Sequence, residues 1–106
     1  METIKDNELK VRVLLSTYRA MLGMISPNVR LISIDWGIDH YAIKAYFDRP
    51  VNDDDFELLK AITTEVAADF PQMNNFKEYA EYSLEPIEKI KALKEMVFLR
   101  YGELKF

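Results

Sequence analysis

Histidine and carboxylates that lie close together in a sequence are the first candidates for chemistry. The chain has one histidine, His40, which follows Asp39 and lies five residues after Asp35. One imidazole and two carboxylates could bind a divalent cation if a rigid framework held them together. The sequence places His40 at a turn, so we interpret it as an exposed turn residue. We predict no metal site and no cofactor.

A run of aspartates, Asp53 to Asp55, is the second candidate, because carboxylates bind calcium and magnesium. The run lacks the alternating ligand spacing and the glycine of an EF-hand loop. Aspartate at the first turn of a helix accepts hydrogen bonds from free backbone amides and suits the helix dipole. We therefore interpret the run as the start of a helix.

Nucleophilic catalysis would need an activated serine, threonine or cysteine. The chain has no cysteine and only three glycines, so neither a cysteine nucleophile nor a glycine-rich phosphate loop is available. No serine lies in a Gly-x-Ser-x-Gly pattern, and no pair of carboxylates is singled out by its spacing. We predict that the chain is not an enzyme; a small enzyme or metal-binding protein that uses His40 stays open as an alternative.

Composition indicates one small domain, residues 1–106, with 49% hydrophobic and 30% charged residues. The first six residues lack the basic and apolar regions of a signal peptide, and no apolar run reaches membrane-spanning length. With no cysteine for disulfides, these features lead us to expect the cytoplasm. The net charge of −4 disfavours direct nucleic-acid binding and is compatible with a basic protein partner.

Helical spacing of apolar residues predicts a first helix that Pro27 ends, with Asp6 or Asn7 as its cap. We expect its buried stripe to consist of Val11, Leu14, Tyr18, Leu22 and Ile25. A second helix is predicted between Asn52 and Pro71. Its apolar stripe comprises Phe56, Leu59, Ile62, Val66 and Phe70.

Strand-like alternation predicts a β-hairpin from 30–36 and 40–47, with turn residues between the two segments. Two further strands are expected at 76–84 and 95–101, where 86–91 is a connection without assignment. The order α-β-β-α-β-β repeats a helix followed by a hairpin. We predict an α+β two-layer sandwich, with two helices on one face of a four-stranded, mainly antiparallel sheet.

Surface residues offer the clearest hint of function. On the second helix, Glu57, Ala61 and Thr64 lie opposite the apolar stripe, and Asp54 and Glu65 flank them. Tyrosines in the strand segments would lie on the sheet face that the helices leave open, where tyrosine suits protein contacts. The predicted partner-binding residues are Asp35, Asp39, Tyr46, Asp54, Glu57, Glu65, Asp69 and Tyr79.

Four blocks of sequence carry a resemblance to a known group of proteins. They are Ser26-Pro27-Asn28-Val29-Arg30, Ala45-Tyr46-Phe47-Asp48, Thr64-Glu65-Val66-Ala67-Ala68-Asp69-Phe70-Pro71 and Val97-Phe98-Leu99-Arg100. Over nearly its whole length the chain resembles short bacterial immunity proteins of toxin systems, in particular those of contact-dependent growth inhibition. The blocks are apolar and structural. No binding residue is transferred from the resemblance, because in these families the interface varies with the toxin.

The resemblance implies that the chain binds and neutralises the C-terminal domain of a toxin by covering its active site or substrate surface. The implied toxin is a nuclease with a basic cleft, for which an acidic binder mimics the charge of the substrate. We expect no direct contact with nucleic acid or membrane, and a monomer or weak dimer before the toxin binds. The alternative is a small homodimeric interaction domain without a toxin.

Overall fold

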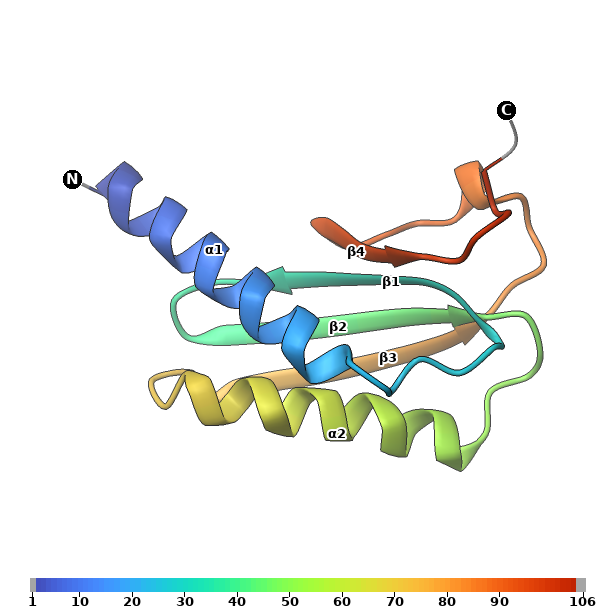
Figure 1. Cartoon of the computed structure of the whole chain (residues 1–106), viewed down its shortest axis with the longest axis horizontal. Coiled ribbons are helices and arrows are strands. Elements are labelled where there is room, and N and C mark those ends of the chain that lie inside the picture. Colours follow the sequence, from blue (N-terminus) through green and yellow to red (C-terminus); the bar gives the residue numbers. More distant parts are fainter. Residues whose placement is uncertain (1, 105–106) are drawn as a thin grey trace.

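The computed structural model describes residues 2–104, with side chains from residue 7 onward. The elements are α1 (Glu2–Met21), β1 (Val29–Trp36), β2 (His40–Phe47), α2 (Asp53–Asp69), β3 (Asn75–Tyr82), a 3₁₀ turn η1 (Ile87–Lys89) and β4 (Glu95–Leu99). Both helices cover one face of a four-stranded sheet (Figure 1). The predicted α+β class is confirmed, and the connection without assignment contains η1.

The sheet has the order β3-β2-β1-β4 and is mixed. β1 pairs antiparallel with β2 and β4, whereas β2 and β3 run parallel. The prediction of a mainly antiparallel sheet with two hairpins is therefore wrong in its second half. The reason is that α2 carries the chain back along the sheet, so β3 enters in the same direction as β2. β4 then pairs at the opposite edge, beside β1.

The main core lies between the sheet and the helices. The first hairpin contributes the alternating residues that its pattern predicted: Ile32, Ile34, Trp36, Tyr41, Ile43, Ala45 and Phe47. From α2 come Leu59, Ile62 and Val66, each 0% exposed, and Phe70 follows the helix end at 1%. The side chains that alternate along the strands and those that recur every 3.6 residues along α2 thus form one shared apolar layer.

The chain between β3 and β4 covers part of the other sheet face. Ile87 packs there with Leu31 and Tyr46 in a second, smaller cluster. The Tyr46 hydroxyl donates a hydrogen bond to the Lys91 carbonyl at 2.9 Å. In addition, the backbone amide of Leu93 donates to the Ser33 hydroxyl at 2.8 Å. This face is therefore only partly open to solvent.

Helix α1 is rotated relative to its predicted orientation. Its buried face consists of Val13, Ser16, Thr17, Ala20 and Met21. Three residues of the predicted stripe, Val11, Tyr18 and Leu22, are instead 55%, 46% and 76% exposed. The stripe prediction is wrong because small side chains let α1 approach α2 and the sheet closely.

The ends of α1 also differ from the prediction. The helix begins at Glu2 rather than at Asp6 or Asn7, and it ends at Met21, before Pro27 is reached. Gly23 follows with φ of +75°, a left-handed conformation that glycine adopts without a steric penalty and that commonly ends helices.

Candidate protein-binding surface

The three residues that were considered as metal ligands lie in and around the β1–β2 turn: Asp35 in β1, Asp39 in the turn and His40 at the start of β2. The Nδ1 atom of His40 is 3.4 Å from the Asp39 carboxylate, while Asp35 accepts a hydrogen bond from the Trp36 amide. The His40 ring lies against Gly37 so closely that a Cβ at that position would collide with it. No group of three histidine, cysteine, aspartate or glutamate side chains within the described part of the chain could hold a metal ion. His40 therefore packs at a turn.

The aspartate run begins α2, as the sequence predicted. Asn52 is the N-cap, and a capping box joins it to Asp55: each side chain accepts a hydrogen bond from the other's backbone amide. Arg49 donates two hydrogen bonds to the Asp55 carboxylate, at 2.6 and 2.9 Å. The guanidinium holds the pKa of Asp55 below its usual value. Asp55 is thus a structural residue, while Asp53 and Asp54 are exposed.

Four other charges hold the start of β1 to the segment that follows β4. Arg30 donates to both carboxylate oxygens of Glu103, at 3.0 and 2.9 Å, and to the Ser83 carbonyl. Arg100 joins Glu103 to Asp48. The hydrogen bond from Arg30 lowers the pKa of Glu103, and that from Arg100 lowers the pKa of Asp48. These charges are fully engaged within the fold, so we assign them a structural role.

The outward side of α2 is where the predicted acidic residues gather. Asp54, Glu57 and Glu65 are exposed there. None of the three forms an ion pair with another residue in the described range. Asp69 lies at the end of the same helix and is turned toward α1, where it accepts hydrogen bonds from Ser16 at 2.7 Å and Arg19 at 3.4 Å. The structure thus brings three free acids onto one helix side.

The remaining predicted contact residues lie elsewhere. Asp39 is exposed at the β1–β2 turn. Its backbone carbonyl accepts a hydrogen bond from the amide of Asn74, the residue before β3. Asp35 and Tyr79 alternate with the core residues of their strands, so they belong to the sheet face away from the helices. Tyr79 is 41% exposed, but Tyr46 is only 6% exposed beneath the η1 segment. The eight residues are therefore spread over the helix side, the β1–β2 turn and the opposite sheet face, and they do not form one surface.

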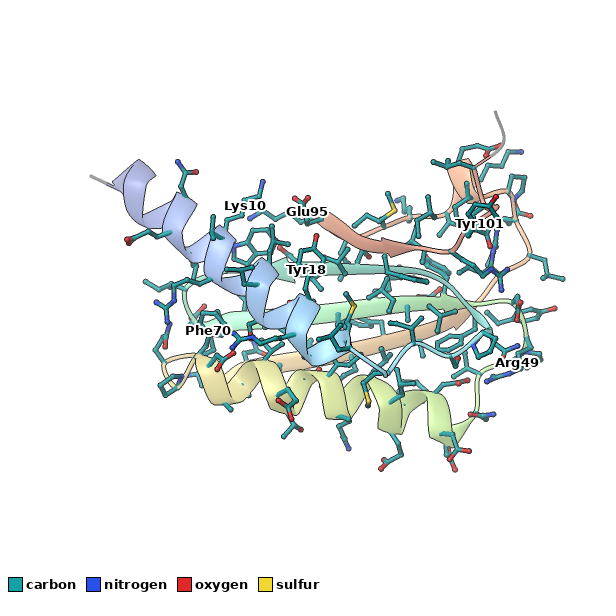
Figure 2. All side chains as sticks on the ribbon, viewed as in Figure 1. Lys10, Tyr18, Arg49, Phe70, Glu95 and Tyr101 are labelled. Carbon is teal, nitrogen blue, oxygen red and sulfur yellow. The ribbon has the colours of Figure 1, made fainter. Side chains whose placement is uncertain are left out.

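The tyrosines do not form the shared open surface that the strand pattern suggested. Tyr41 is 1% exposed beneath the helices, where its hydroxyl lies 3.0 Å from that of Thr17. Burial raises the pKa of Tyr41 to about 12. Tyr101 lies beyond β4 and is fully exposed near the C-terminal end (Figure 2).

A row of exposed apolar side chains on α1 was missed by the sequence reasoning. Val11, Leu15, Tyr18 and Leu22 are 55%, 58%, 46% and 76% exposed. Val11, Leu15 and Tyr18 lie on one side of the helix, opposite Val13 and Ala20, and Leu22 continues the row in the turn that follows Met21. We call this row the α1 strip; Tyr18 is labelled on the helix in Figure 2. The spacing itself was visible in the sequence, but it was assigned to the core.

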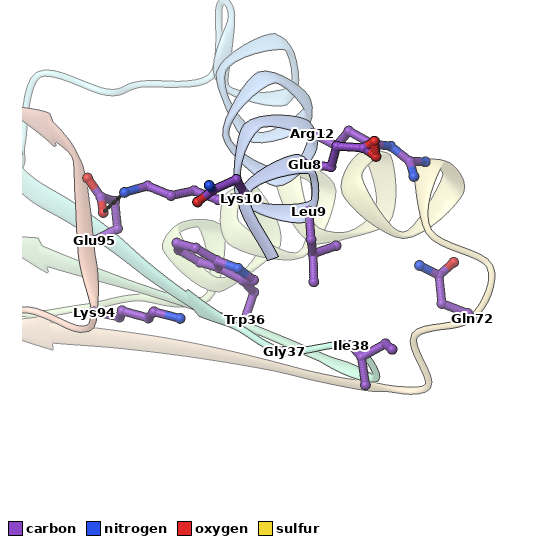
Figure 3. Close-up of a pocket in the computed structure, with 11 residues that line it drawn as sticks. Glu8, Leu9, Lys10, Arg12, Trp36, Gly37, Ile38, Gln72, Lys94 and Glu95 are labelled. Atoms are coloured by element: carbon purple, nitrogen blue, oxygen red, sulfur yellow. Dashed lines mark ion pairs between the residues drawn. The ribbon is translucent and has the colours of Figure 1, made fainter. Parts of the chain in front are cut away.

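A groove of roughly 630 Å³ lies under the N-terminal half of α1, against Trp36 and Ile38 (Figure 3). Lys94 places its ammonium 4.2 Å from the centre of the Trp36 ring, and Lys10 pairs with Glu95 at 3.7 Å. The described lining contains no histidine, serine or threonine. The described lining carries two carboxylates, those of Glu8 and Glu95, and Glu95 is the one that Lys10 engages.

No helix within residues 2–104 combines the length and apolar character that crossing a membrane requires. Nothing among the curated proteins matches the chain. The family model of the MafI2 immunity proteins matches residues 10–102, which extends from the first helix to just past β4. The resemblance to immunity proteins of toxin systems is thereby confirmed, and the chain belongs to the MafI2 immunity protein family.

Proposed function

We propose that the chain neutralises a toxin by binding the toxin domain directly in a one-to-one complex. We further propose that this domain is a nuclease, whose basic substrate surface faces the outward side of α2. Membership of an immunity protein family supports the toxin partner. The observation that supports the charge of the partner is the row of unpaired acids Asp54, Glu57 and Glu65.

Unpaired acids on a rigid helix suit a partner that normally binds nucleic acid. Such a partner exposes lysine and arginine at its substrate cleft. Acids opposite that cleft would speed association and would compete with the phosphates of the substrate. Neutralisation by covering a site requires no catalytic group in the immunity protein. We place the complex in the cytoplasm, as in the contact-dependent systems that the sequence resembles.

Coexpression tests the proposed function most directly. The probe is the toxin domain encoded beside the gene of this chain. Cells that produce this domain with the chain should grow, and cells that produce it alone should stop growing. Death of the coexpressing cells at matched protein levels would show that the chain does not neutralise this toxin.

A charge reversal tests the role of α2. The double variant Glu57→Lys/Glu65→Lys should associate with an inactive form of the toxin domain at least ~10-fold more slowly at low salt, because attraction becomes repulsion. The matched control is Glu85→Lys/Glu88→Lys, which reverses two exposed acids between β3 and β4. Equal slowing in both variants, measured by stopped flow, would mean that α2 faces no basic surface.

A further inference from the structure

The α1 strip has no partner within the described chain. Four large apolar side chains in a row on one helix side form the pattern by which an amphipathic helix docks into a groove. Helix α2 has no such row: its outward side carries acids with Lys60, Thr64 and Ala68. Single exposed apolar residues are ordinary on protein surfaces, but a contiguous row marks an interaction site.

The α1 strip and the acids of α2 belong to the two helices that cover one face of the sheet (Figure 1). On each helix the exposed row lies opposite the residues that are buried in the core, so both rows lie on the outer side of the helix layer. Between the rows, Arg19 pairs with Asp69, and the Arg12 guanidinium lies 5.3 Å from the centre of the Phe70 ring. These two arginines are thus engaged by α2 and its end. The helix layer therefore presents the apolar α1 strip on one helix and the acids on the other, with the exposed Arg12 and Arg19 between them.

We propose that the α1 strip is the hydrophobic anchor of the toxin interface. It docks into an apolar groove of the toxin domain, while Asp54, Glu57 and Glu65 face basic side chains at the rim of that groove. This inference rests on the proposed function and adds the surface that holds the partner. Apolar anchors at the centre of an interface supply most of its affinity, whereas charges at its rim mainly govern association.

Charge favours a basic partner over a second copy of the chain. A two-fold pairing presents the same patch on both subunits. If two α1 helices pair antiparallel across such an axis, the two acidic α2 helices also come to lie opposite each other. Like charges then meet along the whole edge, which opposes association. A basic toxin surface encounters the same acids with the opposite sign.

Removing two leucines from the strip tests the anchor. The variant Leu15→Ser/Leu22→Ser replaces side chains that are 58% and 76% exposed. The matched control, Leu84→Ser/Leu104→Ser, replaces leucines that are 69% and 51% exposed outside both helices. The probe is the purified toxin domain in an inactive form. We expect its dissociation constant to rise at least ~30-fold for the strip variant and to change less than ~3-fold for the control.

Circular dichroism and thermal unfolding should be unchanged in both variants, because all four leucines are more than half exposed. The single variant Tyr18→Glu, in the middle of the strip, should weaken binding in the same direction. If both strip variants fold and bind within ~3-fold of the unmodified chain, the anchor is not on α1, although the proposed function stands. If the unmodified chain does not bind the domain, the proposed function itself fails.

Light scattering tests the alternative that a second copy of the chain, rather than the toxin, covers the α1 strip. We expect the unmodified chain without toxin to have the same mass as the strip variant. A dimer that Leu15→Ser/Leu22→Ser converts to a monomer, and that the control leaves intact, would show that the strip covers a second copy. That result would overturn the assignment of the strip to the toxin.

Discussion

The two helices of this domain use their apolar residues in opposite ways. α2 buries Leu59, Ile62 and Val66 and leaves acids on its outward side; of its predicted stripe only Phe56, in the first turn, is instead 44% exposed. α1 buries mainly small or polar side chains, such as Ser16, Thr17 and Ala20, and exposes large ones in the α1 strip. The large apolar side chains that α2 buries stabilise the core of this chain. Those of the α1 strip contribute little to that core, so their presence on α1 has another reason.

The polar contacts that hold the two helices in place also differ. α2 is fixed at its first turn by the capping box and by the Arg49–Asp55 ion pair. α1 is held by hydroxyl contacts, from Ser16 to Asp69 and between Thr17 and Tyr41. Specific hydrogen bonds of this kind fix the rotation of a helix even where the apolar effect alone would favour another. They keep the strip pointing to solvent.

The largest expected effect comes from the buried side of α2. Leu59→Ala should lower the free energy of unfolding by about 3 kcal/mol, because Leu59 is 0% exposed and its loss leaves a cavity. On α1, Leu22→Ala should change it by no more than about 0.5 kcal/mol, since Leu22 is 76% exposed. Urea unfolding measures both. Similar losses in the two variants would mean that Leu22 is packed in solution and that the helices do not differ.

The next largest effect comes from the buried side of α1, which packs against the core. Ala20→Leu should cost about 2 kcal/mol, because Ala20 is 7% exposed and an added side chain overpacks the core. Ala68→Leu makes the same change on the exposed side of α2 and should stay within about 0.5 kcal/mol. If Ala20→Leu stabilised the protein, α1 would not be close-packed and its rotation would not be fixed.

The contrast between the helices also separates what sequence could predict from what it could not. For α2 the signals are local: Asn52 and Asp55 mark its start, Pro71 follows its end, and one stripe is plainly apolar. For α1 the same periodicity allows two buried faces, one through Leu14 and Tyr18 and one through Val13 and Ala20. Only the neighbouring helix and sheet decide between them, and they are distant in sequence.

The sheet and the candidate surface show the same contrast between features set by local sequence and features set by distant contacts. The β1–β2 hairpin is local and was predicted, whereas the parallel pairing of β2 with β3 depends on the path of α2 across the sheet. The acids Asp54, Glu57 and Glu65 could be found because α2 was oriented correctly. The α1 strip could not, because exposure depends on the rotation of the helix. Tyr46 was expected at the surface, but the η1 segment covers it.

The smallest effect that we predict concerns the ion pair and the capping box at the start of α2. Asp55→Asn should lower the free energy of unfolding at pH 7 by about 1 kcal/mol, because it removes the charge that Arg49 and the helix start stabilise. Asp54→Asn, one residue earlier, changes an exposed carboxylate and should stay within about 0.5 kcal/mol. Equal effects would mean that the ion pair adds nothing to the cap.

The pH dependence gives the sign of this contribution. The hydrogen bonds from Arg49 lower the pKa of Asp55 in the folded state, so the unfolded chain binds a proton more readily. The stabilisation is therefore complete above the unfolded pKa of about 4 and is lost as the pH falls through the folded pKa. In urea unfolding the difference between the unmodified chain and Asp55→Asn should shrink from pH 7 to pH 3. A difference that stays constant over this range would show that the charge of Asp55 does not contribute to the stability of α2.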